Sequence, residues 1–209
     1  LGINNIPPKA CSYSCIYCQV GPTHNPEITP RAFYAPQEIL RSVTDRLEAL
    51  AQRGERVDWL TFVPDGEPTL DANLGETIDL LRPFGIPIAV ISNASLAWRE
   101  DVRAALAKAD WLSLKVDATD PAIWRQVNRP CPALHLDAIL DGVARLASDY
   151  RGTLTTETML VAGVNDTAES VGGVAEYLGR LVPAVAHLAV PPRPPAESYV
   201  RPPDETALV

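Results

Sequence analysis

The chain has 209 residues and a formal net charge of −8, with 46% hydrophobic and 21% charged residues. This size suits one domain, and this composition excludes a largely disordered chain. No run approaches the about 20 apolar residues of a membrane-spanning helix, no secretory leader pattern stands at the start, and the acidic balance disfavours a general nucleic-acid binder. We expect one domain over residues 1–209 and no membrane partner. The first residue is Leu1 rather than Met, so we expect native N-terminal residues to be missing. A leader sequence among those missing residues is an open alternative.

Short apolar runs alternate with amphipathic stretches along the chain. Strands are predicted, in chain order, over residues 1–6, 57–63, 87–92, 111–116, 154–161 and 185–190, and helices over 36–53, 71–84, 98–109, 135–150 and 168–181. In the first helix, Ile39, Val43 and Leu47 recur on one face, which is typical of an amphipathic helix. Asp120-Pro121 and Asp166-Thr167 are helix-start signals.

The alternation of strands and helices predicts an α/β fold with parallel strands joined by right-handed crossovers. A full eight-fold barrel takes about 250 residues, which is more than this chain has. Six strand–helix units would take about 35 residues each, which fits the usual size of such a unit. We therefore expect a partial (βα)6 TIM-like barrel with a parallel sheet, and a flat doubly wound sheet is the competing architecture. No glycine-rich nucleotide-binding loop of the GxGxxG or GxxxxGK[ST] kind follows any predicted strand.

Three of the four cysteines lie in the cysteine loop, residues 9–19 (KACSYSCIYCQ), with the spacing C-x3-C-x2-C. Four cysteines in a chain of this length are not a disulfide framework, so clustered thiols indicate metal binding in a reducing, cytoplasmic setting. A [4Fe–4S] cluster that only carries electrons has four cysteine ligands. Cys11, Cys15 and Cys18 would supply three, which leaves one iron with an open coordination position for a small molecule, by the logic that separates catalytic from structural zinc.

Other readings of these cysteines remain open. His24 would complete a Cys3His zinc site, and Cys131 would complete the ligand set of an electron carrier. Three unrelated buried thiols are the third alternative. As a lone thiol, Cys131 is expected to be structural, and so are the two histidines in predicted elements, His135 and His187.

The cysteine loop follows the first predicted strand, and an aromatic residue, Tyr17, stands directly before its last cysteine. This pattern resembles the radical S-adenosylmethionine (SAM) superfamily. Other segments resemble a narrower branch, the Fe–S oxidoreductases related to the wybutosine-biosynthesis (4-demethylwyosine synthase) group, and the resemblance spans essentially the whole chain. These segments are residues 1–9 (LGINNIPPK), 66–70 (GEPTL), 128–130 (NRP), 163–166 (GVND) and 192–200 (PRPPAESYV).

The resemblance implies that Cys11, Cys15 and Cys18 bind a [4Fe–4S] cluster whose open iron chelates the methionine part of SAM. It implies reductive cleavage of SAM to methionine and a 5′-deoxyadenosyl radical, which abstracts hydrogen from an unidentified small-molecule, peptide or protein substrate. A cofactor of this kind supplies the difficult chemistry, and the protein binds and orients it. The electron would come from a donor such as flavodoxin or ferredoxin.

The resemblance also implies where SAM binds. Gly66 and Glu67 match a glycine-rich motif whose carboxylate would accept a hydrogen bond from the SAM amine, although Asp65 stands where a first glycine is common. If the resemblance is left aside, the dipeptide Asp65-Gly66 predicts only an ordinary turn. The remaining expected contacts lie at strand ends, where barrel enzymes build their sites. They are polar contacts from Ser92 and Asn93, Lys115 to the SAM carboxylate, Asp117 to the ribose, and Tyr17, Met159 and Val161 near the adenine.

On the substrate side, loops at the open mouth of the barrel carry Asn128, Arg129 and Arg193, which would hold an anionic substrate. Within the superfamily the sequence leaves open a wyosine-type modification of tRNA, which the acidic charge disfavours, and a glycyl-radical-activating or peptide-modifying enzyme. Outside it, the alternative is a non-catalytic zinc or Fe–S binding module.

Overall fold

The computed structural model of the chain describes residues 1–191 and 193–204, so Pro192, which begins one of the segments that carry the family resemblance, lies outside the described part. The described residues form one six-stranded parallel sheet, in which the strands lie side by side in chain order. The strands are β1 (Gly2–Ile3), β2 (Leu60–Phe62), β3 (Ile88–Ser92), β4 (Trp111–Lys115), β5 (Thr153–Met159) and β6 (Val185–Ala189).

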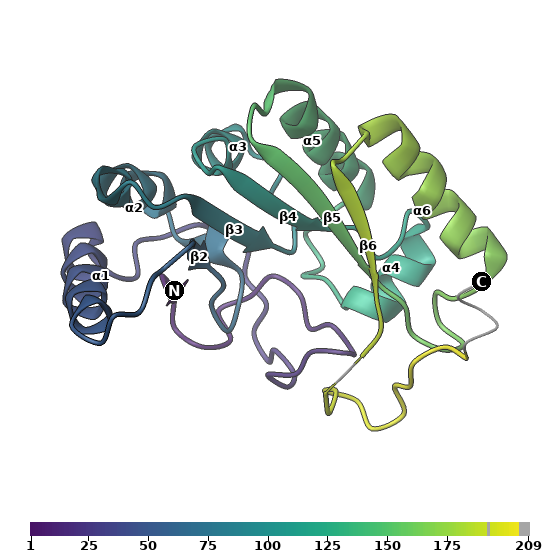
Figure 1. Cartoon of the computed structure of the whole chain (residues 1–209). Helices are drawn as coiled ribbons and strands as arrows, with labels where there is room; N and C mark the ends of the chain where they lie inside the picture. The colour runs from purple at the N-terminus through teal and green to yellow at the C-terminus, as the bar shows by residue number, and fades with distance from the viewer. Residues whose placement is uncertain (192, 205–209) are drawn as a thin grey trace.

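Helices join successive strands, and Figure 1 shows most of them as a layer on one side of the sheet. Among the described residues, no helix combines the length and the apolar character that crossing a membrane requires. The helices are α1 (Pro36–Ala51), α2 (Leu74–Leu81), α3 (Glu100–Leu106), α4 (Pro121–Asn128), α5 (Leu136–Asp149) and α6 (Ala168–Leu181), with short 3₁₀ turns η1 (Pro68–Leu70) and η2 (Arg82–Phe84).

The strand order confirms the predicted open (βα)6 sheet. A doubly wound sheet reverses its strand order at a switch point and carries helices on both faces. Here the order β1 to β6 has no reversal, and β1 and β6 are the two edges of the sheet. The competing flat, doubly wound architecture is therefore wrong. Because all neighbouring strands are parallel, their carboxyl ends lie on one side of the molecule, as Figure 1 shows for β2 to β6.

α2 and α4 differ most from the prediction, and α3 is shorter at both ends than the expected residues 98–109. The helix expected over residues 71–84 ends at Leu81, because Pro83 provides no N–H for a helical hydrogen bond and the chain then turns through Gly85, which has a φ of 67°. α4 was indicated only by its start signal. The side chain of Asp120 caps it by accepting hydrogen bonds from the N–H groups of Ala122 and Ile123.

The first strand is shorter than the six residues expected. After Ile3 the chain leaves the sheet, and the Asn5 side chain donates to the Pro68 carbonyl oxygen at 3.0 Å and to Asp71 Oδ2 at 3.2 Å. This buried contact draws the chain toward η1 instead of continuing the strand. The cysteine loop then begins beside the carboxyl end of β2.

The hydrophobic core fills the space between the sheet and the helix layer. Phe62 and Leu60 of β2, Val90 of β3 and Leu112 of β4 are fully buried there. α2 contributes Ile78, which is buried to the same degree. This packing holds the strand ends in fixed positions relative to one another, as a site built from several strands requires.

The open sheet leaves apolar side chains uncovered at its last strand. Val185 and Leu188 of β6 are 47% and 61% exposed. A closed barrel would pair the two edge strands, so these exposed apolar residues at β6 are a consequence of the open sheet.

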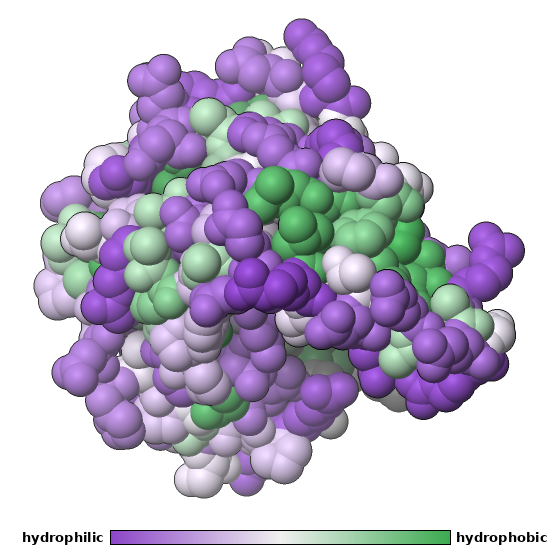
Figure 2. All heavy atoms as spheres, turned by 90° about the vertical axis from the view of Figure 1, so that its left-hand side faces the viewer, coloured by the Kyte–Doolittle hydropathy of each residue, from purple (hydrophilic) through white to green (hydrophobic). Residues whose placement is uncertain are grey.

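Figure 2 shows the side of the molecule that carries α1, where one hydrophobic area lies among hydrophilic atoms.

Candidate functional site

The cysteine loop is fastened by backbone hydrogen bonds at both of its sides. On one side, Lys9 N donates to Asp65 O at 2.6 Å and Glu67 N donates to Ala10 O at 2.9 Å. On the other, Ile16 N donates to Val127 O at 2.9 Å, near the end of α4. The loop is thus held between the chain that follows β2 and the end of α4.

Gly66 is required for this arrangement because of close packing. A Cβ atom at this position would lie 2.2 Å from the Ala10 carbonyl oxygen, which is far inside van der Waals contact. The glycine therefore lets the chain after β2 approach the cysteine loop closely, and the Asp65-Gly66 pair is more than a solvent-exposed turn.

The three loop cysteines are free thiols and half-buried. Burial raises the pKa of Cys11 to about 11 and the pKa of Cys15 to about 12. These thiols would be protonated at neutral pH unless a cation binds them, since metal binding deprotonates a coordinating thiol. Three cysteines within eight residues are soft donors, and this donor chemistry fits an iron–sulfur cluster.

The described residues contain no preformed site for a single metal ion. No group of three His, Cys, Asp or Glu side chains among them is arranged to hold one, and His24 is exposed to solvent. The Cys3His zinc alternative is therefore not supported. A cuboidal cluster binds each cysteine at a different iron and so tolerates wider spacing of the thiols.

A pocket of about 310 Å³ opens beside the cysteine loop. Its size lies at the lower end of small-molecule sites. It brings together seven of the residues singled out in the sequence, and it also contains Lys9, Asp65 and Glu157. The seven are Cys11, Tyr17, Cys18, Gly66, Lys115, Met159 and Arg193.

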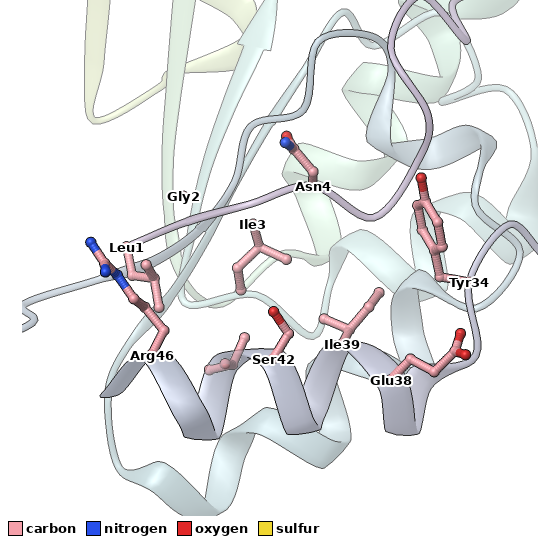
Figure 3. Close-up of a pocket in the computed structure, with 10 residues that line it drawn as sticks. Leu1, Gly2, Ile3, Asn4, Tyr34, Glu38, Ile39, Ser42 and Arg46 are labelled. Atoms are coloured by element: carbon pink, nitrogen blue, oxygen red, sulfur yellow. The ribbon is translucent and has the colours of Figure 1, made fainter. Parts of the chain in front are cut away.

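Two other hollows lie away from the cysteines. One, of about 430 Å³, lies between β1 and α1, where Ile3, Ile39 and Tyr34 face it beside Glu38 and Arg46 (Figure 3). The other, of about 480 Å³, lies between α6 and β6 and is mostly apolar. Neither contains one of the three loop cysteines, so the pocket beside the cysteine loop is the candidate site.

Glu67 is not among the residues that line this pocket. Its carboxylate is 1% exposed and accepts from the Thr69 hydroxyl at 2.6 Å, the Ser92 hydroxyl at 2.7 Å and the Asn93 N–H at 2.7 Å. Burial raises the pKa of Glu67, and these hydrogen bonds oppose the rise. Both side chains are thus hydrogen-bonded within the protein, and the expected contacts of Glu67 and Ser92 with SAM stay predictions. Of this motif, Gly66 faces the pocket.

Asp117 joins the cysteine loop to the last strands. One carboxylate oxygen accepts from the Tyr17 hydroxyl and from Asn128 Nδ2 at 2.7 Å, and the other accepts from Met159 N at 2.8 Å. Asp117 and Asn128 are 4% and 3% exposed. Both side chains are hydrogen-bonded within the protein, and the expected contact of Asp117 with the ribose and of Asn128 with the substrate stay predictions. Asn165, which was not predicted, supports the same group by donating to the Asp117 backbone oxygen at 3.0 Å.

Lys115 forms an ion pair with Glu157 at the pocket wall, and its Nζ lies 5.0 Å from the centroid of the Tyr17 ring. Burial alone would lower the pKa of Lys115, but the carboxylates of Asp117 and Glu157 raise it. Glu157 was missed in the sequence, although it is the direct register partner of Lys115 on the neighbouring strand. Glu157 lies in a strand that also carries four threonines, so its charge alone gave no clear signal, and only the register of β4 and β5 shows the pair.

The remaining predicted residues are divided between the pocket and other surroundings. Arg193 lines the pocket, and its Nη1 donates to Gln19 Oε1 at 3.0 Å. Arg129 instead pairs with Glu197 and donates to the Tyr199 hydroxyl at 3.1 Å. Val161 is fully buried in a small cluster with Ile16 and Val200, so it does not reach the pocket as expected.

A family model described as the radical SAM superfamily matches residues 5–176. The UPF0026 protein of Methanocaldococcus jannaschii is 50% identical over 203 residues, which cover 97% of this chain and 63% of that protein. A UPF0026 protein of Helicobacter pylori is 31% identical over 197 residues, which cover 93% of this chain and 62% of that protein. The chain thus spans about three fifths of the length of these relatives.

Solved structures of low sequence identity share the fold. TYW1 with a lysine–pyruvate adduct bound is 21% identical with a TM-score of 0.64, and the match covers 86% of this chain and 61% of that one. Streptococcus suis SuiB bound to S-adenosylmethionine is 13% identical with a TM-score of 0.63, and the match covers 92% of this chain and 39% of that one.

Proposed function

The chain belongs to the radical SAM superfamily, whose members use a [4Fe–4S] cluster and SAM, and from this premise we propose that it is a radical SAM enzyme whose cluster is held by Cys11, Cys15 and Cys18. The observation that carries the proposal is the shared pocket. Two of these thiols line it together with Gly66, Lys115 and Met159, at the carboxyl ends of β2, β4 and β5. Barrel enzymes bind their ligands at this end of the sheet.

When bound, the cluster and SAM together would supply a 5′-deoxyadenosyl radical for hydrogen abstraction from the substrate. The chain's own residues bind SAM and the substrate and orient them. Lys115, held in place by Glu157, presents a positive charge to a carboxylate in the pocket. The Tyr17 ring, fixed by its bond to Asp117, and the Met159 side chain provide apolar contact for an adenine.

We propose a substrate with an anionic group. Arg193 is exposed at the pocket and forms no ion pair among those found in the described residues. A guanidinium group binds a carboxylate or phosphate through two parallel hydrogen bonds. A small molecule or peptide suits the pocket, and the electron donor we propose is a flavodoxin or a ferredoxin. We place the protein in the cytoplasm, where such donors work.

Anaerobic reconstitution tests the proposal. The chain should bind iron and sulfide, and with dithionite it should convert SAM to 5′-deoxyadenosine. Cys15→Ser should lose both properties, whereas the matched variant Cys131→Ser should keep both, because Cys131 is not one of the three cysteines of the cysteine loop. A colourless protein that binds zinc and leaves SAM intact would instead identify a non-catalytic module. Titration with tRNA at several salt concentrations tests the wyosine-type alternative, for which a steep salt dependence is required.

A further inference from the structure

Each sulfur of the three loop cysteines accepts a hydrogen bond from a side-chain nitrogen. The three donors come from different places in the fold: the start of the cysteine loop, the turn after β3 and the last residue of α4. The donor–sulfur distances are 3.5 Å from Lys9 Nζ to Cys18, 3.6 Å from Asn93 Nδ2 to Cys11, and 3.5 Å from Asn128 Nδ2 to Cys15.

The two asparagine donors are held in place by other bonds. Asn128 is 3% exposed, and its Nδ2 also donates to Asp117 Oδ2 at 2.7 Å. Asn93 is turned by its own Oδ1, which accepts from Ser95 N at 2.9 Å, and its Nδ2 also donates to Ser12 Oγ at 3.0 Å. Both amides are thus oriented toward sulfur by the fold itself, without a bound group.

The Lys9 donor differs because it carries a charge. Its Nζ donates to the Gly21 carbonyl oxygen at 2.6 Å as well as to Cys18, and its backbone has a φ of 65°. This left-handed conformation is rare for a residue with a side chain. It directs the ammonium group across the loop, so one positive charge is fixed beside the third sulfur.

Hydrogen bonds to cysteine sulfur affect the reduction potential of an iron–sulfur cluster. One-electron reduction adds negative charge, part of which falls on the sulfurs, and an N–H donor stabilises that charge. A donor therefore favours the reduced cluster and raises its potential.

We infer that Lys9, Asn93 and Asn128 are positioning residues that set the reduction potential of the cluster through these three N–H···S hydrogen bonds. The inference rests on the proposed function, because it requires the cluster at Cys11, Cys15 and Cys18. In this inference Asn93 and Asn128 act on the cysteine ligands of the cluster, rather than through the expected contacts with SAM and substrate.

The test measures potential rather than activity. The reconstituted chain is titrated anaerobically with dithionite, which delivers one electron to each cluster, and the reduced fraction is followed by electron paramagnetic resonance. Asn128→Leu keeps the side-chain size but removes the donor. We expect an about tenfold lower ratio of reduced to oxidised cluster at a fixed applied potential, which is about 59 mV for a one-electron couple.

Asn165→Leu is the matched control. Asn165 is equally buried and bonds to the Asp117 backbone, but it donates to no cysteine sulfur. Its potential should equal that of the wild type. If Asn128→Leu fails to bind a cluster, Lys9→Met, at a half-buried position, decides the question by the same expected fall in potential.

Resonance Raman spectra of the iron–cysteine stretching modes give an independent readout. Loss of an N–H···S bond should raise the frequency of one such mode in Asn128→Leu and in Lys9→Met. Unchanged potentials in variants that bind a full cluster would overturn the inference while leaving the proposed function intact, and so would an equal fall in Asn165→Leu. A wild-type chain that binds no cluster would overturn both.

Discussion

The backbone N–H of Asn93 donates to Glu67 Oε2 at 2.7 Å and so joins the chain after β3 to the chain after β2. The ladder between these two strands ends at the register pair Phe62 and Val90. The buried carboxylate therefore continues the connection beyond the sheet, at the place where the cysteine loop is attached. Ser92 completes it by donating its hydroxyl to Oε1 of the same carboxylate.

Replacing this carboxylate should destabilise the fold. In Glu67→Gln, an amide nitrogen at one of the two oxygen positions would face an N–H or O–H donor instead of accepting from it. An unsatisfied buried polar group costs about 1–3 kcal/mol, so we expect the free energy of unfolding to fall by that amount. Urea denaturation measures it. Glu48→Gln on the exposed face of α1 is the control and should change stability by no more than about 0.5 kcal/mol. Equal effects of the two variants would contradict the role of Glu67.

Gly66→Ala should detach the cysteine loop from β2. The added Cβ would lie 2.2 Å from the Ala10 carbonyl oxygen, so the hydrogen bond from Glu67 N to that oxygen must lengthen or break. We expect less iron bound per chain after reconstitution and faster proteolysis within the loop. Gly172→Ala is the control, because a Cβ there meets nothing within 4 Å. Since alanine favours a helix interior over glycine by about 0.5–1 kcal/mol, this second variant should be more stable than the wild type.

The Lys115–Glu157 pair should behave as a partly buried ion pair. Lys115→Met leaves the Glu157 carboxylate without its partner, and that side chain is only 34% exposed. We expect a loss of about 1–3 kcal/mol in the free energy of unfolding, less than the about 3–5 kcal/mol for a fully buried pair. Lys108→Met removes the surface partner of Asp79 and should cost at most about 1 kcal/mol.

A double variant, Lys115→Met with Glu157→Leu, separates the pair from its surroundings. If the cost comes from an unpaired carboxylate, the double variant should recover stability relative to Lys115→Met alone. Calorimetric SAM titration of the same proteins measures the second role of Lys115. Wild-type affinity for SAM in Lys115→Met would refute its contact with the SAM carboxylate.

The strands and the larger helices were predictable from the sequence because their signals are local. The helix α6 was predicted with its observed bounds, since Thr167 caps its start and apolar residues follow at helical spacing. Of the register pair Lys115 and Glu157, only Lys115 was predicted as a site residue. A charged residue near a strand end, taken alone, indicates exposure to solvent. Only the pairing of β4 with β5 shows that they meet.

The roles of the polar site residues were not predictable in the same way. Sequence position placed Asp117 at the end of a strand, which agrees with the structure, whereas Asn128 was expected in a loop and is the last residue of α4. Whether a side chain faces the pocket or is satisfied by a neighbour depends on contacts between distant segments. The bond from Asn128 to Asp117 and the bond from Tyr17 to the same carboxylate are contacts of this kind.

A buried aromatic pair anchors the middle of the cysteine loop to α4. Trp124 Nε1 donates to the Tyr13 hydroxyl at 3.2 Å, and the two rings meet edge to face with their centroids 6.0 Å apart. Tyr13→Phe would keep the ring contact but leave the indole N–H without a partner in a site that water does not reach. We expect the free energy of unfolding to fall by about 1–3 kcal/mol.

Tyr199→Phe is the control for this change, because Tyr199 is 55% exposed and water can replace its hydroxyl. The double variant Tyr13→Phe with Trp124→Phe removes donor and acceptor together, so it loses packing but leaves no unsatisfied N–H. If the hydrogen bond matters as argued, the effects of the two single changes should not add in the double variant. Strict additivity in urea denaturation would instead show that ring packing alone holds the loop to α4.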